Sequence, residues 1–275
     1  SFFAWFRYWN LNAKVNQVKS LESGKPIEAT EFDLYIQSVS SAVNACLKPS
    51  GWGGISYSFS LEELVAHHPE HGELPVEWLS DGIRNMIGMV ADIAYRATKL
   101  NPHLGANASS QTPGIVLIDE VDMHLHPEWQ QVVLQGLTEA FPSVQFIVTT
   151  HSPQVLSTVR RECIRILGRD TDGRTVATEP LAHTYGQSSQ LVMQRVMQVD
   201  PLPPIHEKDA LRELTRLVDR GDYATSRAVE WMKRLGGKLG DTHEQIIRIR
   251  RSISRQIELA ELAARIREPK VDKAG

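Results

Sequence analysis

The sequence predicts an α/β protein with a mostly parallel sheet and a helical appendage at its C-terminal end. Two apolar runs, residues 114–118 and 144–150, are rich in β-branched side chains, which is typical of parallel strands that are buried on both faces. A helical pattern at residues 127–140 separates them, so the three segments predict a right-handed βαβ unit. From residue 206 onward, apolar side chains recur at helical spacing, which predicts amphipathic helices.

The N-terminal part predicts two helices and a strand. Residues 2–21 predict the first helix, and residues 19–29 predict a polar loop. Thr30, with Asp33 three residues later, predicts the capped start of the second helix. Alternating apolar and polar residues at 55–59 predict a strand. The first helix is rich in aromatic side chains, which favour a buried core over a platform for stacking nucleic-acid bases. These side chains are Phe2, Phe3, Trp5, Phe6, Tyr8 and Trp9.

The segments that flank the two apolar runs complete the pattern. A turn is predicted at residues 67–72 and a helix from residue 80 to about residue 100. A linker at residues 101–113 leads into the first apolar run. After the second run, residues 152–159 predict the start of a helix, and residues 163–167 predict a short strand.

The composition excludes several classes of protein. The 275 residues carry a formal net charge of −3, with 41% hydrophobic and 23% charged residues, which excludes a disordered chain and a globally basic nucleic-acid binder. Cys46 and Cys163 are too few for a disulfide framework, so a cytoplasmic location is expected. No apolar run reaches the roughly 20 residues of a membrane span, so we expect no membrane partner.

Two acids directly follow the first apolar run. Open α/β sheets place their ligands at the carboxyl ends of their strands, so Asp119 could hold Mg²⁺ and Glu120 could polarise an attacking water during nucleotide hydrolysis. The second run ends in the sequence Thr-Thr-His-Ser, which would bring His151 to the same edge, within reach of a γ-phosphate. The alternatives are a strand that simply ends in solvated acids and a histidine with a structural role.

Residues 79–84, with the sequence Leu-Ser-Asp-Gly-Ile-Arg, predict a helix N-terminus that can bind an anion. Ser80 would cap the helix, Gly82 would allow a close backbone approach, and Arg84 would add a fixed positive charge. The alternative is an ordinary capped helix.

In this order, the three segments resemble the ABC-type ATPases of the SMC-like group, over about residues 52–199. Residues 79–84 are similar to the signature motif of that group, and residues 115–120 are similar to its Walker B strand with the catalytic glutamate. Asp122 lies where the D-loop is expected, and residues 150–152 resemble the H-switch.

A longer run at residues 119–130 points to one branch of this group. Its sequence is Asp-Glu-Val-Asp-Met-His-Leu-His-Pro-Glu-Trp-Gln. It is similar to the PtuA-type ATPases of Septu and retron-linked antiphage systems. The resemblance implies a P-loop NTPase-like fold that uses ATP and Mg²⁺. Asp119 would then hold Mg²⁺, Glu120 would orient the attacking water, His151 would contact the γ-phosphate, and Asp122 would couple two sites.

The same resemblance implies a head-to-tail dimer or higher oligomer. Ser80, Asp81, Gly82 and Arg84 of one protomer would cover the ATP held by the other. Such ATPases work beside an HNH nuclease of the PtuB type, and some also hold a reverse transcriptase with its RNA–DNA product. We therefore expect an ATP hydrolase that controls a partner nuclease. The alternatives are a scaffold that holds nucleotide without turnover and a DNA-repair ATPase of the SMC/RecF type.

The sequence departs from the pattern of these ATPases in one respect. It contains no GxxxxGK[ST] phosphate-loop motif, although the usual mode of ATP binding needs one. Since the sequence begins with Ser1, we expect the lobe with this loop to lie N-terminal to it in a longer protein. The resemblance then assigns residues 1–185 to the C-terminal part of the ATPase domain and residues 186–275 to a helical region that docks a partner.

Other charged residues have simpler interpretations. Related nucleases carry an Asp-x-Asp pair after the H-switch, but Asp170 and Asp172 fit a hairpin turn, so we expect no nuclease centre in this chain. His124 and His126 are expected to pack in a loop rather than bind a metal ion. An acid-free arginine cluster in the last helix could contact DNA phosphates or a partner protein; a solvated helix face is the alternative. The cluster consists of Arg248, Arg250, Arg251 and Arg255.

Overall fold

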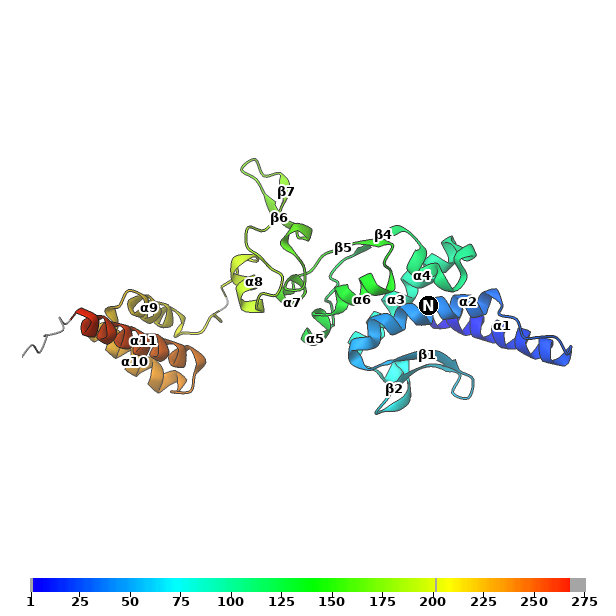
Figure 1. Ribbon diagram of the computed structural model, residues 1–275, viewed down its shortest axis with the longest axis horizontal. Coiled ribbons are helices and arrows are strands. Elements are labelled where there is room, and N and C mark those ends of the chain that lie inside the picture. The colour runs from blue at the N-terminus through cyan, green and yellow to red at the C-terminus, as the bar shows by residue number, and fades with distance from the viewer. Residues whose placement is uncertain (1, 201, 268–275) are drawn as a thin grey trace, which may run out of the picture. The chain divides into compact units, whose positions relative to one another are not determined.

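The computed structural model describes residues 2–200 and 202–267, with side chains as far as residue 262. The chain divides into two compact units, Ser1–Val199 and Asp200–Gly275 (Figure 1). The first unit begins with α1 (Phe2–Glu22), α2 (Glu31–Leu47), β1 (Gly53–Ser58), β2 (Glu63–His68), β3 (Gly72–Pro75), α3 (Asp81–Leu100) and α4 (Ala108–Gln111). It continues with β4 (Gly114–Ile118), α5 (Pro127–Gln130), α6 (Val133–Ala140), β5 (Val144–Val148), α7 (Pro153–Leu156), β6 (Ile166–Arg169), β7 (Thr175–Thr178) and α8 (Ser189–Arg195).

Four of the six aromatic side chains of α1 belong to the core or pack against it, as predicted, whereas Phe3 and Tyr8 are exposed. Helix α1 packs along α2 (Figure 1), and Trp9 is only 1% exposed. Its ring stacks on Tyr95 at 5.5 Å and lies 5.2 Å from Tyr35, while the Lys99 ammonium lies 5.5 Å from its centroid. These contacts join α1 to α2 and α3, so the aromatic segment fixes the N-terminal helices to one another.

The start of α2 confirms the predicted cap. The Asp33 N–H donates to the Thr30 hydroxyl at 3.4 Å, and the Thr30 N–H donates to the Asp33 carboxylate at 2.8 Å. This reciprocal pair satisfies two backbone donors that the first helical turn otherwise leaves unpaired. The first helix extends one residue beyond the predicted end, so the predicted loop begins only at Ser23.

Helices α2 and α6 meet at Cys46 and Gly136. A methyl group on Gly136 would lie 3.2 Å from the Cys46 Cα atom, so the helices are packed at close range. Burial raises the pKa of the Cys46 thiol from 9.0 to about 12, and the Glu139 carboxylate adds to the rise. The folded protein therefore keeps this thiol protonated at a pH where the unfolded chain ionises it.

We expect two consequences of the raised pKa of Cys46. Its contribution to stability is complete below pH 9 and is lost as the pH rises toward 12, because only the unfolded chain then gains thiolate. At pH 8, a disulfide reagent should modify the exposed Cys163 quickly and Cys46 only on unfolding. Reaction kinetics of the wild type and Cys163→Ser test this. Two equally fast thiols in the native protein would contradict it.

The strands form three separate sheets. β1, β2 and β3 pair antiparallel in sequence order, and β6 pairs antiparallel with β7. The predicted turn at residues 67–72 is wrong in part, because His67 and His68 lie in β2 and only residues 69–71 connect it to β3. The two β2 histidines therefore pair with Glu73 and Gly72 across the ladder.

The parallel sheet consists of β4 and β5, in register from Gly114 with Val144 to Ile118 with Val148. Helices α5 and α6 connect the two strands, which confirms the predicted α/β class and strand–helix–strand unit. Burial on both faces is not observed. One face packs on the core through side chains such as Phe146, whereas on the other face Leu117 is 74% exposed. Among the residues that the structure describes, β4 and β5 pair only with each other, and Ile115 and Ile147 are also exposed on the outer face.

Several predicted segments have different boundaries. The linker predicted at residues 101–113 contains a 3₁₀ turn and α4. The buried Ser109 N–H donates a hydrogen bond to the Ser38 hydroxyl at 3.0 Å. The helix predicted at residues 127–140 is interrupted between α5 and α6, and the helix predicted from residue 152 ends at Leu156. The short strand predicted at residues 163–167 corresponds to β6, which begins at Ile166.

The second unit is built from three helices, as the periodicity predicted: α9 (Lys208–Asp219), α10 (Ser226–Leu239) and α11 (Glu244–Arg267). Its core consists of one apolar stripe from each helix: Leu211, Leu214, Val218, Ala228, Leu235, Ile246 and Ile249. Helix α10 continues through Gly236 and Gly237. Across the described part of the chain, none of the helices combines the length and apolarity needed to span a bilayer.

Candidate functional site

The carboxyl ends of β4 and β5 meet at one edge of the parallel sheet. Because Ile118 pairs with Val148, Asp119 and Glu120 face the segment that begins at Thr149. The Thr149 hydroxyl donates to the Asp119 carboxylate and accepts the Glu120 N–H at 2.8 Å. At this edge, direct hydrogen bonds therefore join Asp119 and Glu120 to the polar segment that follows β5.

A tight turn follows Glu120 and brings Asp122 to the same segment. The Met123 N–H donates to the Glu120 carbonyl at 2.9 Å, and the Leu125 N–H donates to the Asp122 carbonyl at 3.1 Å. Glu120 has a φ of +50° and His124 a φ of +62°, which costs about 1–2 kcal/mol for each residue that is not glycine. Thr150 donates its hydroxyl proton to the Asp122 carboxylate, so tertiary contacts help to hold this turn.

His151 is exposed at this edge and is followed by Ser152, which caps α7. The Ser152 hydroxyl donates to the Gln130 side chain at 2.7 Å, and the Gln130 amide donates to the Leu125 carbonyl at 3.0 Å. Besides the hydrogen bond from Thr150 to Asp122, the side chain of Gln130 thus links the segment around His151 to the turn after Glu120. The resemblance placed Thr150 in the H-switch, but no individual role was predicted for Thr149 or Gln130, although a polar cluster at a strand end was the available signal.

The N-terminus of α3 lies against the same turn. A Cβ atom on Gly82 would lie 3.0 Å from the His124 carbonyl oxygen, so the predicted close backbone approach is made to the protein's own chain. Ser80 occupies the N-cap position, but its side chain makes no capping hydrogen bond, so that prediction is wrong. Its carbonyl begins the helix by accepting the Arg84 N–H at 3.0 Å, and the residue itself is exposed.

The charge of Arg84 is compensated within its own helical turn. Its guanidinium pairs with the Asp81 carboxylate and donates to the Glu77 carbonyl at 3.3 Å. The side chain of Asp81 is 75% exposed. Solvent screens the pair, so it contributes little to stability.

The donor set at the sheet edge fits a magnesium ion. Mg²⁺ takes oxygen ligands and is usually held by one or two carboxylates together with phosphate oxygens and water. The exposed Asp119 carboxylate supplies one such ligand at the end of β4. Glu120 lies next to it on the backbone, with its carboxylate also exposed.

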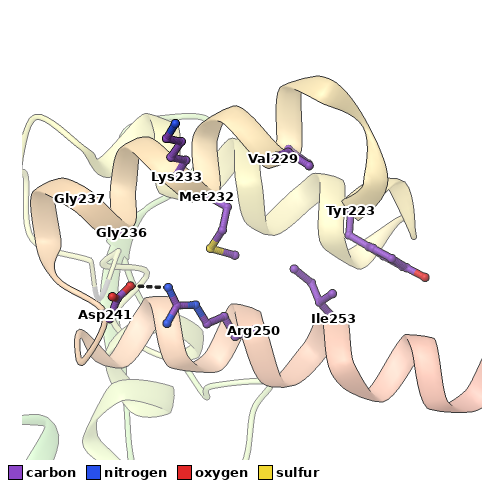
Figure 2. Close-up of a pocket in the computed structure, with 10 residues that line it drawn as sticks. Tyr223, Val229, Met232, Lys233, Gly236, Gly237, Asp241, Arg250 and Ile253 are labelled. Carbon is purple, nitrogen blue, oxygen red and sulfur yellow. Dashed lines mark hydrogen bonds and ion pairs between the residues drawn. The ribbon is translucent and has the colours of Figure 1, made fainter.

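The predicted arginine cluster is not free of acids. Arg248 lies 3.5 Å from Glu244, and Arg250 pairs with Asp241 (Figure 2). The acids come from outside the cluster itself, because α11 begins at Glu244, one turn before Arg248, and the turn before α11 brings Asp241 to Arg250. Arg251 and Arg255 are exposed on α11. A groove of about 530 Å³ lies between α10 and α11 and is lined by side chains such as Met232, Ile253 and Tyr223.

The remaining candidate residues have local roles. His126 caps α5 by accepting the Glu128 N–H at 3.5 Å. Asp170 accepts two backbone N–H groups of the β6–β7 turn, from Asp172 at 2.9 Å and Arg174 at 2.8 Å, which confirms the predicted hairpin. Within the residues that the structure describes, no three His, Cys, Asp or Glu side chains are grouped so that they could hold a metal ion.

Comparison with known proteins agrees with the motifs. Residues 53–157 match the family described as "AAA domain, putative AbiEii toxin, Type IV TA system". The Retron Vc95 probable ATPase of Vibrio cholerae serotype O1 biovar El Tor is 39% identical over 164 residues, which cover 58% of this chain and 31% of that protein. The Retron Ec83 probable ATPase of Escherichia coli is 36% identical over 185 residues, which cover 67% of this chain and 33% of that protein.

Two further similarities are more distant. The Septu protein PtuA of Bacillus thuringiensis is 28% identical over 156 residues, which cover 54% of this chain and 38% of that protein. A solved SMC ATPase chain aligns with a TM-score of 0.39 and 17% identity over 59% of this chain and 91% of that chain. The chain spans about a third of the length of these curated relatives. Residues 53–157 therefore match this AAA family, in a chain that is similar to the probable ATPases of retron systems and to the Septu protein PtuA.

Proposed function

We propose that this chain is part of an antiphage ATPase that hydrolyses ATP at sites shared by two protomers and thereby controls a partner HNH nuclease. The observation that carries the proposal is the sheet edge where Asp119 and Glu120 meet the segment that contains His151. Carboxylates at the carboxyl end of a parallel strand are suited to nucleotide hydrolysis.

Each residue at the edge has a distinct proposed role. Asp119 would hold Mg²⁺, which supplies charge neutralisation to the phosphates when it is bound. The Glu120 carboxylate would accept a proton from the attacking water and orient it toward the γ-phosphate. His151, exposed beside them, would contact the γ-phosphate, and Asp122 would carry the state of one site to the other. The helical region 186–275 would dock the partner.

The opposite wall of the site would come from a second protomer. Ser80, Asp81, Gly82 and Arg84 lie at the N-terminus of α3, where backbone N–H groups and the helix dipole favour an anion. Because the hydroxyl of Ser80 makes no capping bond, it is available to a ligand. When the second protomer binds, Asp81 would release Arg84 and contact residues at the interface between the protomers. The guanidinium of Arg84 would then be available to pair with the phosphates.

Mixing two inactive variants of the full-length protein tests the shared site. Ser80→Glu introduces a carboxylate, which a helix N-terminus tolerates but which repels phosphate, and Glu120→Gln removes the carboxylate of residue 120. Each variant alone should be inactive. A one-to-one mixture should regain about a quarter of the wild-type ATPase rate, because half of random dimers are mixed and each holds one intact site. A mixture as inactive as its parents would contradict sites that are shared between protomers.

A further inference from the structure

Thr149, the first residue after β5, bonds to four consecutive residues of the acidic segment. Its N–H donates to the Ile118 carbonyl at 2.9 Å, and its carbonyl accepts the Val121 N–H at 3.0 Å. Between these two bonds, its hydroxyl donates to the Asp119 carboxylate and accepts the Glu120 N–H at 2.8 Å. Every polar group of one threonine is therefore used on the segment that carries both acids.

These bonds act where the backbone needs restraint. Glu120 has a φ of +50°, a conformation that a residue with a Cβ atom keeps only when its surroundings impose it. The bond from its N–H to Thr149 is one such restraint, and it fixes the direction in which the Glu120 side chain leaves the chain. Asp119 is exposed, so the hydroxyl of Thr149 also selects one orientation for a carboxylate that would otherwise change rotamer freely.

The chemistry of position 149 is restrictive. One atom, close to the backbone, must both donate to a carboxylate and accept from an N–H, and among short side chains only the hydroxyl of serine or threonine does so. Thr150 uses its own hydroxyl in the same manner on different partners, the Asp122 carboxylate and the Ser152 N–H at 3.0 Å. Of the two threonines, Thr149 is therefore the one that hydrogen-bonds to Asp119 and Glu120, and Thr150 is the one that hydrogen-bonds to Asp122.

The geometry points to Thr149 as a positioning residue that holds Asp119 in place for the divalent cation and Glu120 in place for the attacking water. This inference rests on the proposed function. Residues that orient a metal ligand without contacting the metal typically contribute a factor of about 10–100 to metal affinity or activity. The hydroxyl of Thr149 should therefore affect cation binding as well as turnover.

Three variants of the full-length protein test the role of this hydroxyl. Thr149→Val keeps the shape of the side chain without the hydroxyl, and Thr149→Ser keeps the hydroxyl without the methyl group. Thr138→Val is the matched control, because it removes an exposed hydroxyl that bonds only to backbone carbonyls of α6, at 3.0 Å from that of Leu134.

The readout of binding is titration with Mn²⁺, followed by electron paramagnetic resonance with a non-hydrolysable ATP analogue present. Thr149→Val should weaken Mn²⁺ binding about 10-fold and lower kcat about 10–100-fold, with a smaller change in the KM for ATP. Thr149→Ser and Thr138→Val should stay within about threefold of the wild type, which is below the usual effect of losing such a positioning contact. Without nucleotide, the Glu120 amide proton should exchange faster in Thr149→Val than in the wild type.

Three outcomes would overturn the inference. If Thr149→Val binds Mn²⁺ and turns over ATP as well as Thr138→Val does, the hydroxyl of Thr149 does not position Asp119 or Glu120. A loss in Thr149→Ser, which keeps the hydroxyl, as large as the loss in Thr149→Val would show that the hydroxyl is not the group that positions the two acids. If the wild type binds Mn²⁺ with the nucleotide but releases no phosphate from ATP, then the proposed hydrolysis is wrong, and so is the role of Thr149 in positioning the attacking water. In that case, the Mn²⁺ titration still decides the role of Thr149 toward Asp119.

Discussion

Replacing Glu120 with glutamine is expected to lower ATP hydrolysis by the full-length protein about 10²–10⁴-fold, while ATP remains bound. Glutamine has the size of glutamate but cannot accept a proton from the attacking water. The variant should therefore accumulate in the ATP-bound, associated state, because the nucleotide that joins two protomers is no longer consumed. Phosphate release and the molar mass in the presence of ATP measure the two effects.

The matched control for this prediction is Glu128→Gln. Glu128 lies in α5, eight residues further along the chain, and its side chain is 88% exposed. The same chemical change there should leave the rate of hydrolysis within about twofold, as surface substitutions away from special features usually do. If Glu120→Gln hydrolyses ATP as fast as Glu128→Gln, Glu120 does not activate the water.

Replacing Trp9 with alanine is expected to lower the free energy of unfolding of the first unit by about 3–5 kcal/mol. The side chain is 1% exposed and contacts the rings of Trp5, Tyr35 and Tyr95. Its removal leaves a cavity between α1, α2 and α3 that rigid helices cannot close. Urea unfolding, followed by far-ultraviolet circular dichroism, measures the loss without relying on tryptophan fluorescence.

Tyr8→Ala is the control on the same helix, since Tyr8 is 57% exposed. Its effect should stay below about 1 kcal/mol, because most of its surface is in water in the folded protein as well. Equal losses in the two variants would contradict the assignment of Trp9 to the core. Unchanged stability in Trp9→Ala, combined with weaker binding of single-stranded DNA, would favour a base-stacking platform instead.

Features that depend on neighbouring residues were predictable from the sequence. The capping box of Thr30 and Asp33 spans four residues, and its chemistry is local, so the pattern alone predicts it. The apolar runs that form β4 and β5 have the length and the β-branched content of strands, and their parallel pairing follows from the helical stretch between them.

Features that depend on tertiary contacts were not predictable. An apolar run predicts burial but not on which faces, so the exposed Leu117 could not be foreseen. Ser80 has the right side chain for a cap, yet its hydroxyl makes no capping hydrogen bond in the fold. Arg250 gains Asp241 only because a turn reverses the chain between them. The bonds of Thr149 to Asp119 and Glu120 likewise require the register of two strands that lie about 30 residues apart.

The central claim is that the carboxyl edge of β4 and β5 hydrolyses ATP. The most direct test is phosphate release by the purified full-length protein with ATP, with and without Mg²⁺. We predict release that requires Mg²⁺ and stops in Glu120→Gln. Release that continues at the same rate without Mg²⁺ or in Glu120→Gln, or no release from the wild type, would contradict the claim.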